Sequence, residues 1–214
     1  MGDLIDLDQR RADRARASSD PRPAFFFDLS SPLSYLVSER IERTLGDARW
    51  IPVAFGPAPG PGGDHELAML RDHAESRART LRLPLVWPDK FPTQALCALR
   101  AAAHACEIGA GERFALAASR LAFCGGFDLD DPETLAEAAA AAAVPLNDCL
   151  QAAAEVDRDL ALRATANVLR SRGITELPAF AVGRHWFGGE PGLPAACAML
   201  DRPAGYGRPL APVG

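Results

Sequence analysis

The sequence lacks every arrangement of cysteines that would point to a redox centre, a zinc site or a secreted disulfide framework. It has five cysteines in 214 residues, and no two of them are separated by only two residues. Without a Cys-x-x-Cys pair there is no dithiol motif or zinc knuckle, and an odd number does not suit a disulfide framework. We therefore expect free structural thiols in a reducing compartment, at positions Cys97, Cys106, Cys124, Cys149 and Cys197.

Long apolar runs and blocks of basic residues are also missing. No segment approaches 18 uncharged apolar residues, and residues 1–22 alternate acidic and basic side chains, which predicts a flexible leader instead of a signal peptide. The 23 basic and 28 acidic residues give a net charge of −5 without a basic cluster, which argues against a nucleic-acid partner. The four histidines show no metal-ligand spacing. We expect a cytoplasmic protein with no membrane, nucleic-acid or metal partner.

The amino-terminal part of the chain has the pattern of a β-α-β unit. Residues 24–29 form a short, aromatic and nearly continuous apolar run, typical of a strand that is buried on both faces. Ser31 followed by Pro32 is typical of a helix start, and this helix should end near Gly46. Residues 49–55 predict a second strand, which should run parallel to the first because a helix connects them.

The carboxyl-terminal part returns to strands after a long alanine-rich block. Helical periodicity predicts helices within this block at residues 64–82, 93–109, 111–123, 131–143 and 146–171. Beyond it, residues 178–182 and 184–187 flank Gly183 as a β-hairpin, and a short helix follows at 193–200.

This order of elements predicts an α/β protein with a thioredoxin-like fold that is interrupted by a large all-helical insertion. The predicted parts are a leader at 1–22, a thioredoxin-like domain at 23–63 and 166–202, the insertion at 64–165, and an irregular tail at 203–214.

The start of the first helix carries the first functional signal. In a thioredoxin-like fold this helix points its N-terminus at the active site, where redox members place two cysteines. In this chain the four residues at the start of the helix, Ser31 to Ser34, are Ser-Pro-Leu-Ser, which cannot form a disulfide. Lowering the pKa of a thiol by two units needs about 2.7 kcal/mol of preference for the thiolate. The N-terminus of a helix can stabilise an anion by up to about 2 kcal/mol, and a hydrogen bond to a charged group adds roughly 1.5–3 kcal/mol, so the two together suffice. Ser31 can thus stabilise a ligand thiolate, or it can serve only as a helix cap.

Pro178 is the second signal, because it opens a strand directly after a loop. About 5–6% of X-Pro bonds in folded proteins are cis, so 18 prolines give roughly one. In this fold, a cis bond there turns the backbone of Leu177 toward the start of the first helix, where it can pair with a thiol tripeptide. Considered alone, Pro178 is better interpreted as a trans proline at a strand start.

Taken together, these segments resemble a known family. Residues 27–36, Phe-Asp-Leu-Ser-Ser-Pro-Leu-Ser-Tyr-Leu, are similar to the opening signature of 2-hydroxychromene-2-carboxylate isomerases and kappa-class glutathione transferases. Both belong to the DsbA-like branch of the thioredoxin superfamily. The resemblance continues through residues 84–92, 98–101, 173–178 and 187–190, so it spans nearly the whole chain after the leader.

The resemblance implies roles for individual residues. Ser31 would hydrogen-bond and activate the sulfur of glutathione, Leu177 would bind the tripeptide backbone, and Pro178 would be the cis-proline. Gly189 and Glu190 would hold the γ-glutamyl end.

The substrate pocket would include three further residues: Leu33, Tyr35 and Trp87. Two positions depart from the family pattern. Leu33 stands where the family usually has an aromatic residue, and Glu190-Pro191 stands where it usually has Asp, often followed by Arg.

The activity implied is that of an isomerase in aromatic catabolism, with glutathione or another low-molecular-weight thiol as its cofactor. In the family chemistry a bound thiolate adds to a conjugated carbon of a small aromatic substrate, the ring opens, a bond rotates, and elimination returns the thiol. Related proteins are often dimers, which leaves a homodimer open. The alternatives are a kappa-type glutathione transferase or peroxidase and a non-catalytic thioredoxin-like binding scaffold. A disulfide oxidoreductase ranks last, because both essential sulfurs are absent.

Overall fold

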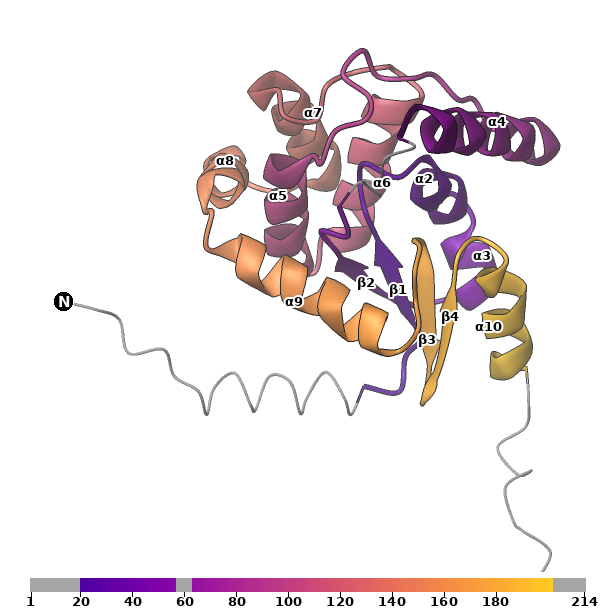
Figure 1. Ribbon diagram of the computed structural model, residues 1–214. Helices are drawn as coiled ribbons and strands as arrows, with labels where there is room; N and C mark the ends of the chain where they lie inside the picture. Colours follow the sequence, from indigo (N-terminus) through magenta and orange to yellow (C-terminus); the bar gives the residue numbers. More distant parts are fainter. Residues whose placement is uncertain (1–19, 57–62, 202–214) are drawn as a thin grey trace, which may run out of the picture.

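The computed structural model describes residues 20–56 and 63–201 (Figure 1). Most of the predicted leader and the whole predicted tail lie outside the described residues. The strands are β1 (Ala24–Phe27), β2 (Arg49–Pro52), β3 (Ala179–Val182) and β4 (His185–Gly188). The helices are α2 (Pro32–Ser38), α3 (Ile41–Leu45), α4 (Gly63–Leu81), α5 (Leu96–Glu107), α6 (Gly111–Phe123), α7 (Pro132–Ala142), α8 (Leu146–Ala154), α9 (Arg158–Ser171) and α10 (Gly192–Leu200).

The sheet has the strand order β2-β1-β3-β4. β1 and β2 are parallel, as expected for strands joined by a helical crossover, and β3 is antiparallel to both β1 and β4. The carboxyl ends of β1 and β2 and the amino end of β3 therefore meet at one edge of the sheet. This is the thioredoxin-like order expected from the sequence.

The alternation of side chains along β1 gives the sheet two buried faces. Phe25 and Phe27 point into the larger core, where both contact the indole of Trp50. Phe26 points to the opposite face, where its ring stacks on Trp186 with ring centroids 5.5 Å apart. Because both faces are covered, β1 is a continuous apolar run and not an alternating one.

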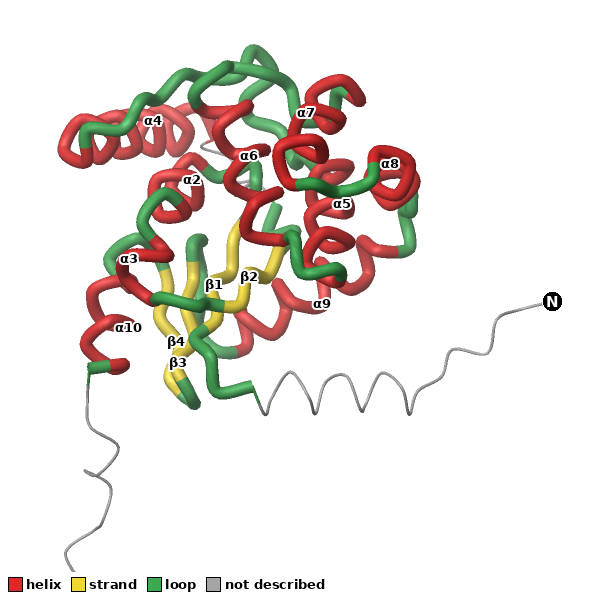
Figure 2. The backbone as a smooth tube through the Cα atoms, turned by 180° about the vertical axis from the view of Figure 1, so that it is seen from behind, coloured by secondary structure: helices red, strands yellow, loops and turns green. Residues whose placement is uncertain are grey.

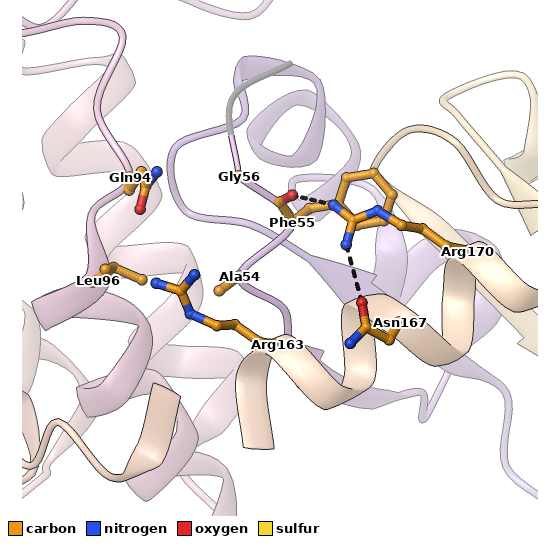
Figure 3. A pocket seen from close by; sticks show the side chains of 8 residues that line it. All are labelled: Ala54, Phe55, Gly56, Gln94, Leu96, Arg163, Asn167 and Arg170. Atoms are coloured by element: carbon orange, nitrogen blue, oxygen red, sulfur yellow. Dashed lines mark hydrogen bonds between the residues drawn. The ribbon is translucent and has the colours of Figure 1, made fainter. Parts of the chain in front are cut away.

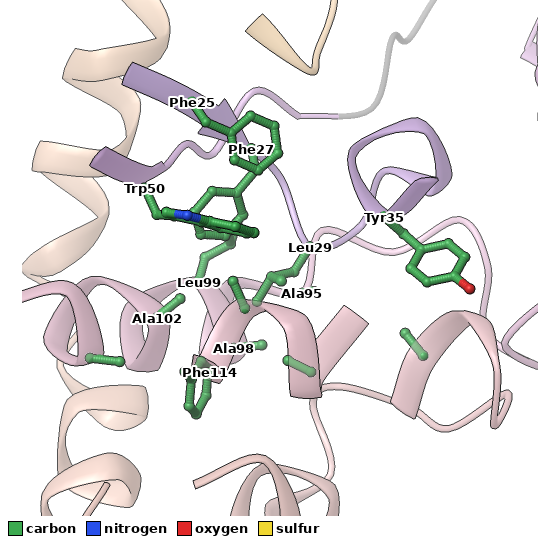
Figure 4. Close-up of a cluster of buried hydrophobic side chains, with 14 of the residues drawn as sticks. Phe25, Phe27, Leu29, Tyr35, Trp50, Ala95, Ala98, Leu99, Ala102 and Phe114 are labelled. Carbon is green, nitrogen blue, oxygen red and sulfur yellow. The ribbon is translucent and has the colours of Figure 1, made fainter. Parts of the chain in front are cut away.

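The helices of the insertion, α4 to α8, lie together on one side of the sheet (Figures 1 and 2). Their core is continuous with the sheet: Phe25, Phe27 and Trp50 meet apolar residues of α5 and α6 such as Leu99 and Phe114 (Figure 4). Many of the buried side chains of the insertion are alanines, which allow the helices to approach closely. The buried alanines of α5, α6 and α7 are Ala98, Ala101, Ala102, Ala105, Ala115, Ala118, Ala122, Ala138, Ala139 and Ala142.

Two predicted helices are broken in the structure. The helix predicted at 146–171 is two helices, because α8 packs against α5 whereas α9 turns away to cover the sheet. Arg100 stabilises the break by donating to the carbonyl oxygen of Ala153 at 3.0 Å, in the last turn of α8. The helix predicted after Ser31 likewise divides into α2 and α3 around Arg40.

The predicted boundary between the insertion and the thioredoxin-like part falls inside α9. The first turn of α9 is tied to the insertion by Asp159, which accepts a hydrogen bond from Arg100 at 2.7 Å. Further along the same helix, Ala166 and Leu169 pack on the sheet. The two parts therefore share one helix as well as one core. Among the described residues, no helix is both long enough and apolar enough to cross a membrane.

Candidate functional site

A buried aspartate organises the turn between β1 and α2. The carboxylate of Asp28 accepts hydrogen bonds from the backbone N–H and the hydroxyl of Ser30, at 2.8 and 2.6 Å, and from the backbone N–H of Phe55 at 3.3 Å. Asp28 is 4% exposed. Burial raises its pKa to about 6, although the hydrogen bonds from Ser30 and Phe55 act in the opposite direction. Asp28 therefore holds the turn in place from inside the protein.

Ser31 is the N-cap of α2, as the sequence predicts. Its Oγ accepts a hydrogen bond from the backbone N–H of Ser34 at 3.2 Å. A hydroxyl oxygen that accepts one hydrogen bond still carries a proton to donate, and Ser31 is only partly buried. Pro32 has no N–H, so the backbone N–H of Leu33 is the next free donor; it makes no hydrogen bond within the described residues. Two donors are thus available at this helix start.

The bond between Leu177 and Pro178 is cis. The pairing of Phe26 with Ala179 places Pro178 beside the end of β1, where the turn to Ser31 begins. Within the described residues, the backbone groups of Leu177 make no hydrogen bond. The structure thus brings the two sequence signals, Ser31 and the Leu177-Pro178 bond, to the same edge of the sheet.

The position that would hold a second cysteine in a redox protein is filled by Ser34. Its side chain is buried, and its hydroxyl accepts a hydrogen bond from the backbone N–H of Asp28 at 3.3 Å. Ser34 therefore supports the turn, and neither Ser31 nor Ser34, the two ends of the four-residue motif, provides a sulfur.

Glu190 lies in the loop after β4 and is buried against two arginines. Its Oε1 accepts hydrogen bonds from Arg40 and Arg77, both at 2.6 Å, so one carboxylate joins the α2–α3 turn to α4. Burial raises the pKa of Glu190, but the hydrogen bonds from Arg77 and Arg40 outweigh it and hold the pKa below its ordinary value. With all three groups ionised, the trio carries a net charge of +1.

Gly189 precedes this carboxylate with a φ of +70°. A side chain there would be strained, and its Cβ would collide with Oε1 of Glu176. Glycine therefore lets the loop after β4 pass close to Glu176, the residue that directly precedes Leu177.

The three predicted pocket residues occupy different surroundings. Leu33 and Tyr35 are buried in the core, and the hydroxyl of Tyr35 donates to the carbonyl oxygen of Pro84 at 2.9 Å. Trp87 is partly exposed; its indole N–H donates to Glu75 at 3.0 Å, and the guanidinium of Arg71 lies 5.2 Å from its ring centroid. Of the three, Trp87 has the most accessible ring.

The sequence gives no signal for the two arginines that bind Glu190, Arg40 and Arg77. Arginines are common on helix surfaces, and nothing in the sequence says that Arg40 and Arg77 converge on one carboxylate. Asp28 does carry a sequence signal, because its place at the end of a buried strand, two residues before Ser30, is typical of a side chain that caps a turn.

A family comparison decides where the chain belongs. The model of the DSBA-like thioredoxin domain matches residues 24–194, from β1 to the start of α10. The chain belongs to the DsbA-like thioredoxin family.

Solved structures of two proteins with different described activities share the fold. A 2-hydroxychromene-2-carboxylate isomerase is 14% identical, with a TM-score of 0.70 over 83% of this chain and 93% of that one. A protein described as a probable DsbA oxidoreductase, from Streptomyces coelicolor, is 17% identical, with a TM-score of 0.71 over 90% of this chain and 93% of that one. No curated protein matches the sequence. Since the two structural neighbours differ in their described activities, the DsbA-like fold does not choose between them.

Proposed function

We propose that this DsbA-like protein is a thiol-dependent isomerase. It binds glutathione, or another low-molecular-weight thiol, and rearranges a small aromatic compound of the hydroxychromene carboxylate type. The observation that carries the proposal is the unused hydroxyl proton of Ser31 at the edge where the backbone of Leu177 is unpaired within the described residues. The fold shared with a 2-hydroxychromene-2-carboxylate isomerase over nearly its whole length supports it.

The residues present fit a bound thiol tripeptide. The N–H and C=O of Leu177 can pair with the peptide backbone of the ligand in the manner of an added strand. The hydroxyl of Ser31 and the N–H of Leu33 can both donate to a sulfur anion. Each hydrogen bond to a charged group is worth roughly 1.5–3 kcal/mol, and about 2.7 kcal/mol lowers a thiol pKa by two units. The two donors suffice even though α2 has only seven residues and thus a short dipole.

When bound, glutathione would supply the sulfur nucleophile that the reaction needs. The protein's part is to hold the thiolate and the substrate in place. Asp28 fixes the Ser30-Ser31 turn, Ser31 orients its proton by accepting the N–H of Ser34, and the cis bond before Pro178 presents the Leu177 backbone.

A kappa-type transferase or peroxidase would use the same donors. The two activities differ in the fate of the thiol, which an isomerase returns and a transferase or peroxidase consumes. A non-catalytic scaffold predicts no thiol binding at all.

The proposal is tested by calorimetric titration of reduced glutathione into the wild type and two variants. Ser31→Ala removes the donor, and we expect at least a tenfold loss of affinity because one hydrogen bond to a charged group disappears. The same change removes the cap and costs about 1 kcal/mol of stability, so unfolding is measured in parallel. Ser31→Thr keeps both the acceptor and the proton, and we expect it to bind nearly as the wild type does.

A second measurement follows the state of the sulfur. Ultraviolet difference absorbance should detect bound glutathione as the thiolate at neutral pH in the wild type and in Ser31→Thr, but not in Ser31→Ala. Equal binding and equal thiolate absorbance in all three proteins would leave Ser31 as a cap only and would refute the proposal.

A further inference from the structure

The Arg40–Glu190–Arg77 trio is a charged cluster that the proposed function has not used. Both guanidinium groups donate to the same oxygen of Glu190, at 2.6 Å. An arginine has five N–H donors, and the buried Nε of Arg77 has no hydrogen-bond partner among the described residues. One carboxylate therefore does not use all the donors that the two arginines bring together.

The cations are the accessible part of this trio. The side chains of Arg40 and Arg77 are 22% and 29% exposed, whereas that of Glu190 is 10% exposed. Because the two arginines hold the pKa of Glu190 below its ordinary value, the carboxylate is ionised at neutral pH and the trio has a net charge of +1. A ligand that reaches the trio thus meets guanidinium groups, which attract a carboxylate and repel an ammonium.

The trio lies beside the segment that presents the backbone of Leu177. The last residue of β4 pairs with the first residue of β3, so the loop after β4 begins beside Leu177 and Pro178. Gly189, the first residue of this loop, passes so close to Glu176 that a Cβ would collide with its side chain. Glu190 follows directly. The trio is therefore near one end of a ligand that pairs with the Leu177 backbone.

This charge bears on what the loop can recognise. The family resemblance implies that Gly189 and Glu190 hold the γ-glutamyl end of glutathione, which carries an ammonium and a carboxylate. Both groups together would leave the net charge of the cluster at +1, whereas a carboxylate alone would bring it to zero. Since uncompensated charge is costly in a mostly buried place, the trio favours a ligand end that has the carboxylate without the ammonium.

We propose that Arg40 and Arg77 select the thiol cofactor, and that the thiol they prefer ends in a carboxylate with no amino group beside it. This inference rests on the proposed function, because it names the chemical class of the thiol that Ser31 would hold. The two arginines bind the far end of the ligand and take no part in the reaction at its sulfur. Glutaryl-cysteinyl-glycine has the preferred chemistry.

Three ligands separate the two charges at this end. Glutathione carries both, glutaryl-cysteinyl-glycine lacks the amino group, and 4-aminobutyryl-cysteinyl-glycine lacks the carboxylate. They are titrated calorimetrically into the full-length protein. We expect the glutaryl ligand to bind about tenfold more tightly than glutathione, because the repelled ammonium is gone, and the aminobutyryl ligand to bind most weakly.

Arg77→Gln should weaken binding of the glutaryl ligand about tenfold and should not weaken binding of the aminobutyryl ligand. Arg77→Lys keeps the positive charge and should keep the order of the three ligands. Arg79→Gln is the matched control, because Arg79 lies on the same helix, its side chain is 72% exposed and it makes no contact with Glu190. It removes the same charge and should have no effect.

A second cationic place is tested in the same way. A hollow of about 230 Å³ at the carboxyl end of β2 is lined by Arg163 and Arg170 (Figure 3). We expect Arg163→Gln to leave the preference for the glutaryl ligand unchanged. If Arg163→Gln abolished this preference and Arg77→Gln did not, the carboxylate would bind in the hollow and the inference would be overturned.

The inference also fails if glutathione binds as tightly as the glutaryl ligand or more tightly. The same three ligands with alanine in place of cysteine separate this result from the proposed function. If these sulfur-free ligands keep the expected order while Ser31→Ala leaves glutathione binding unchanged, the proposed function is refuted and the selection by the arginines stands. If Ser31→Ala weakens glutathione binding but the order is absent, only the selection is refuted. A protein that binds none of the ligands refutes both.

Discussion

At the scale of single residues, Asp28 connects the parts of the site. Its carboxylate joins the end of β1, the turn that carries Ser31, and the backbone of Phe55 after β2. Buried carboxyl groups shift their protonation toward the neutral form, and the pKa of about 6 places the change between acidic and neutral pH. The side chain that holds the turn therefore changes its charge between acidic and neutral pH.

The pH dependence of stability follows from this pKa. In the unfolded chain Asp28 ionises near its ordinary value of 3.8, whereas in the folded protein it keeps its proton until about pH 6. Between these values the folded state binds more protons, so the stability contributed by this group falls as the pH rises from about 4 to about 6. The loss amounts to roughly 3 kcal/mol, at about 1.4 kcal/mol per pKa unit.

Urea unfolding of the wild type and of Asp28→Asn at pH 4 and pH 7 measures this loss. The amide that Asp28→Asn introduces cannot ionise, so we expect the wild type to lose more stability than the variant over this interval. If the difference in the free energy of unfolding between the wild type and Asp28→Asn were the same at pH 4 and pH 7, the raised pKa of Asp28 would be contradicted.

At the scale of elements, the Arg40–Glu190–Arg77 trio ties together three segments. Arg40 stands between α2 and α3, Arg77 is on α4, and Glu190 is in the loop between β4 and α10. Removal of the anion would leave two guanidinium groups facing each other in a mostly buried place. The cost of breaking a buried pair is larger than that of a surface pair.

Glu190→Gln should therefore destabilise the protein by about 2 kcal/mol at neutral pH. Because the folded pKa of Glu190 is lowered, its contribution is present at neutral pH and is lost as the pH falls through that pKa. Thermal and urea unfolding should thus show a smaller effect in acid. Glu137→Gln, an exposed change on α7, is the control and should have little effect. If Glu190→Gln destabilised the protein no more than Glu137→Gln does, the Arg40–Glu190–Arg77 trio would contribute no more stability than an exposed ion pair does.

Some elements of the fold can be predicted from the sequence and others cannot. The aromatic run of β1, the Ser31-Pro32 helix start and the hairpin around Gly183 each carry a local signal, and each is confirmed. The break at Glu155 between α8 and α9 is not local, because both sides have high helix propensity and the turn is imposed by packing on α5 and on the sheet. The cis bond before Pro178 has no local signal either. It is expected only because Pro178 opens a strand that follows the Ser31 helix start in the order of a thioredoxin-like fold.

At the scale of the whole molecule, the DsbA-like family name and the residues of this chain point to different chemistry. A family named for disulfide exchange needs a pair of sulfurs at the start of α2, and this chain has Ser31 and Ser34 there. All five cysteines are free, and Cys149 is fully buried. The fold is therefore held together by its shared core and not by cross-links.

We expect the protein to be indifferent to reducing agents. Its unfolding midpoint should be the same with and without dithiothreitol, and Ellman's reagent should count five thiols in urea but fewer in the folded state. The protein should also fail to accelerate the reduction of insulin by dithiothreitol. Acceleration of insulin reduction, or a midpoint that falls on reduction, would show a disulfide function that these residues do not explain.

The pairing of β1 with β3 sets the order in which the molecule can be completed during synthesis. Phe25 is synthesised before its partner Phe180, which follows only after the entire helical block. Until then β1 has β2 on one side and an open edge on the other, and Glu190, which joins Arg40 to Arg77, has yet to be made. The end of the sheet that carries Ser31 and Leu177 is thus completed last during synthesis, when the final hairpin pairs with β1.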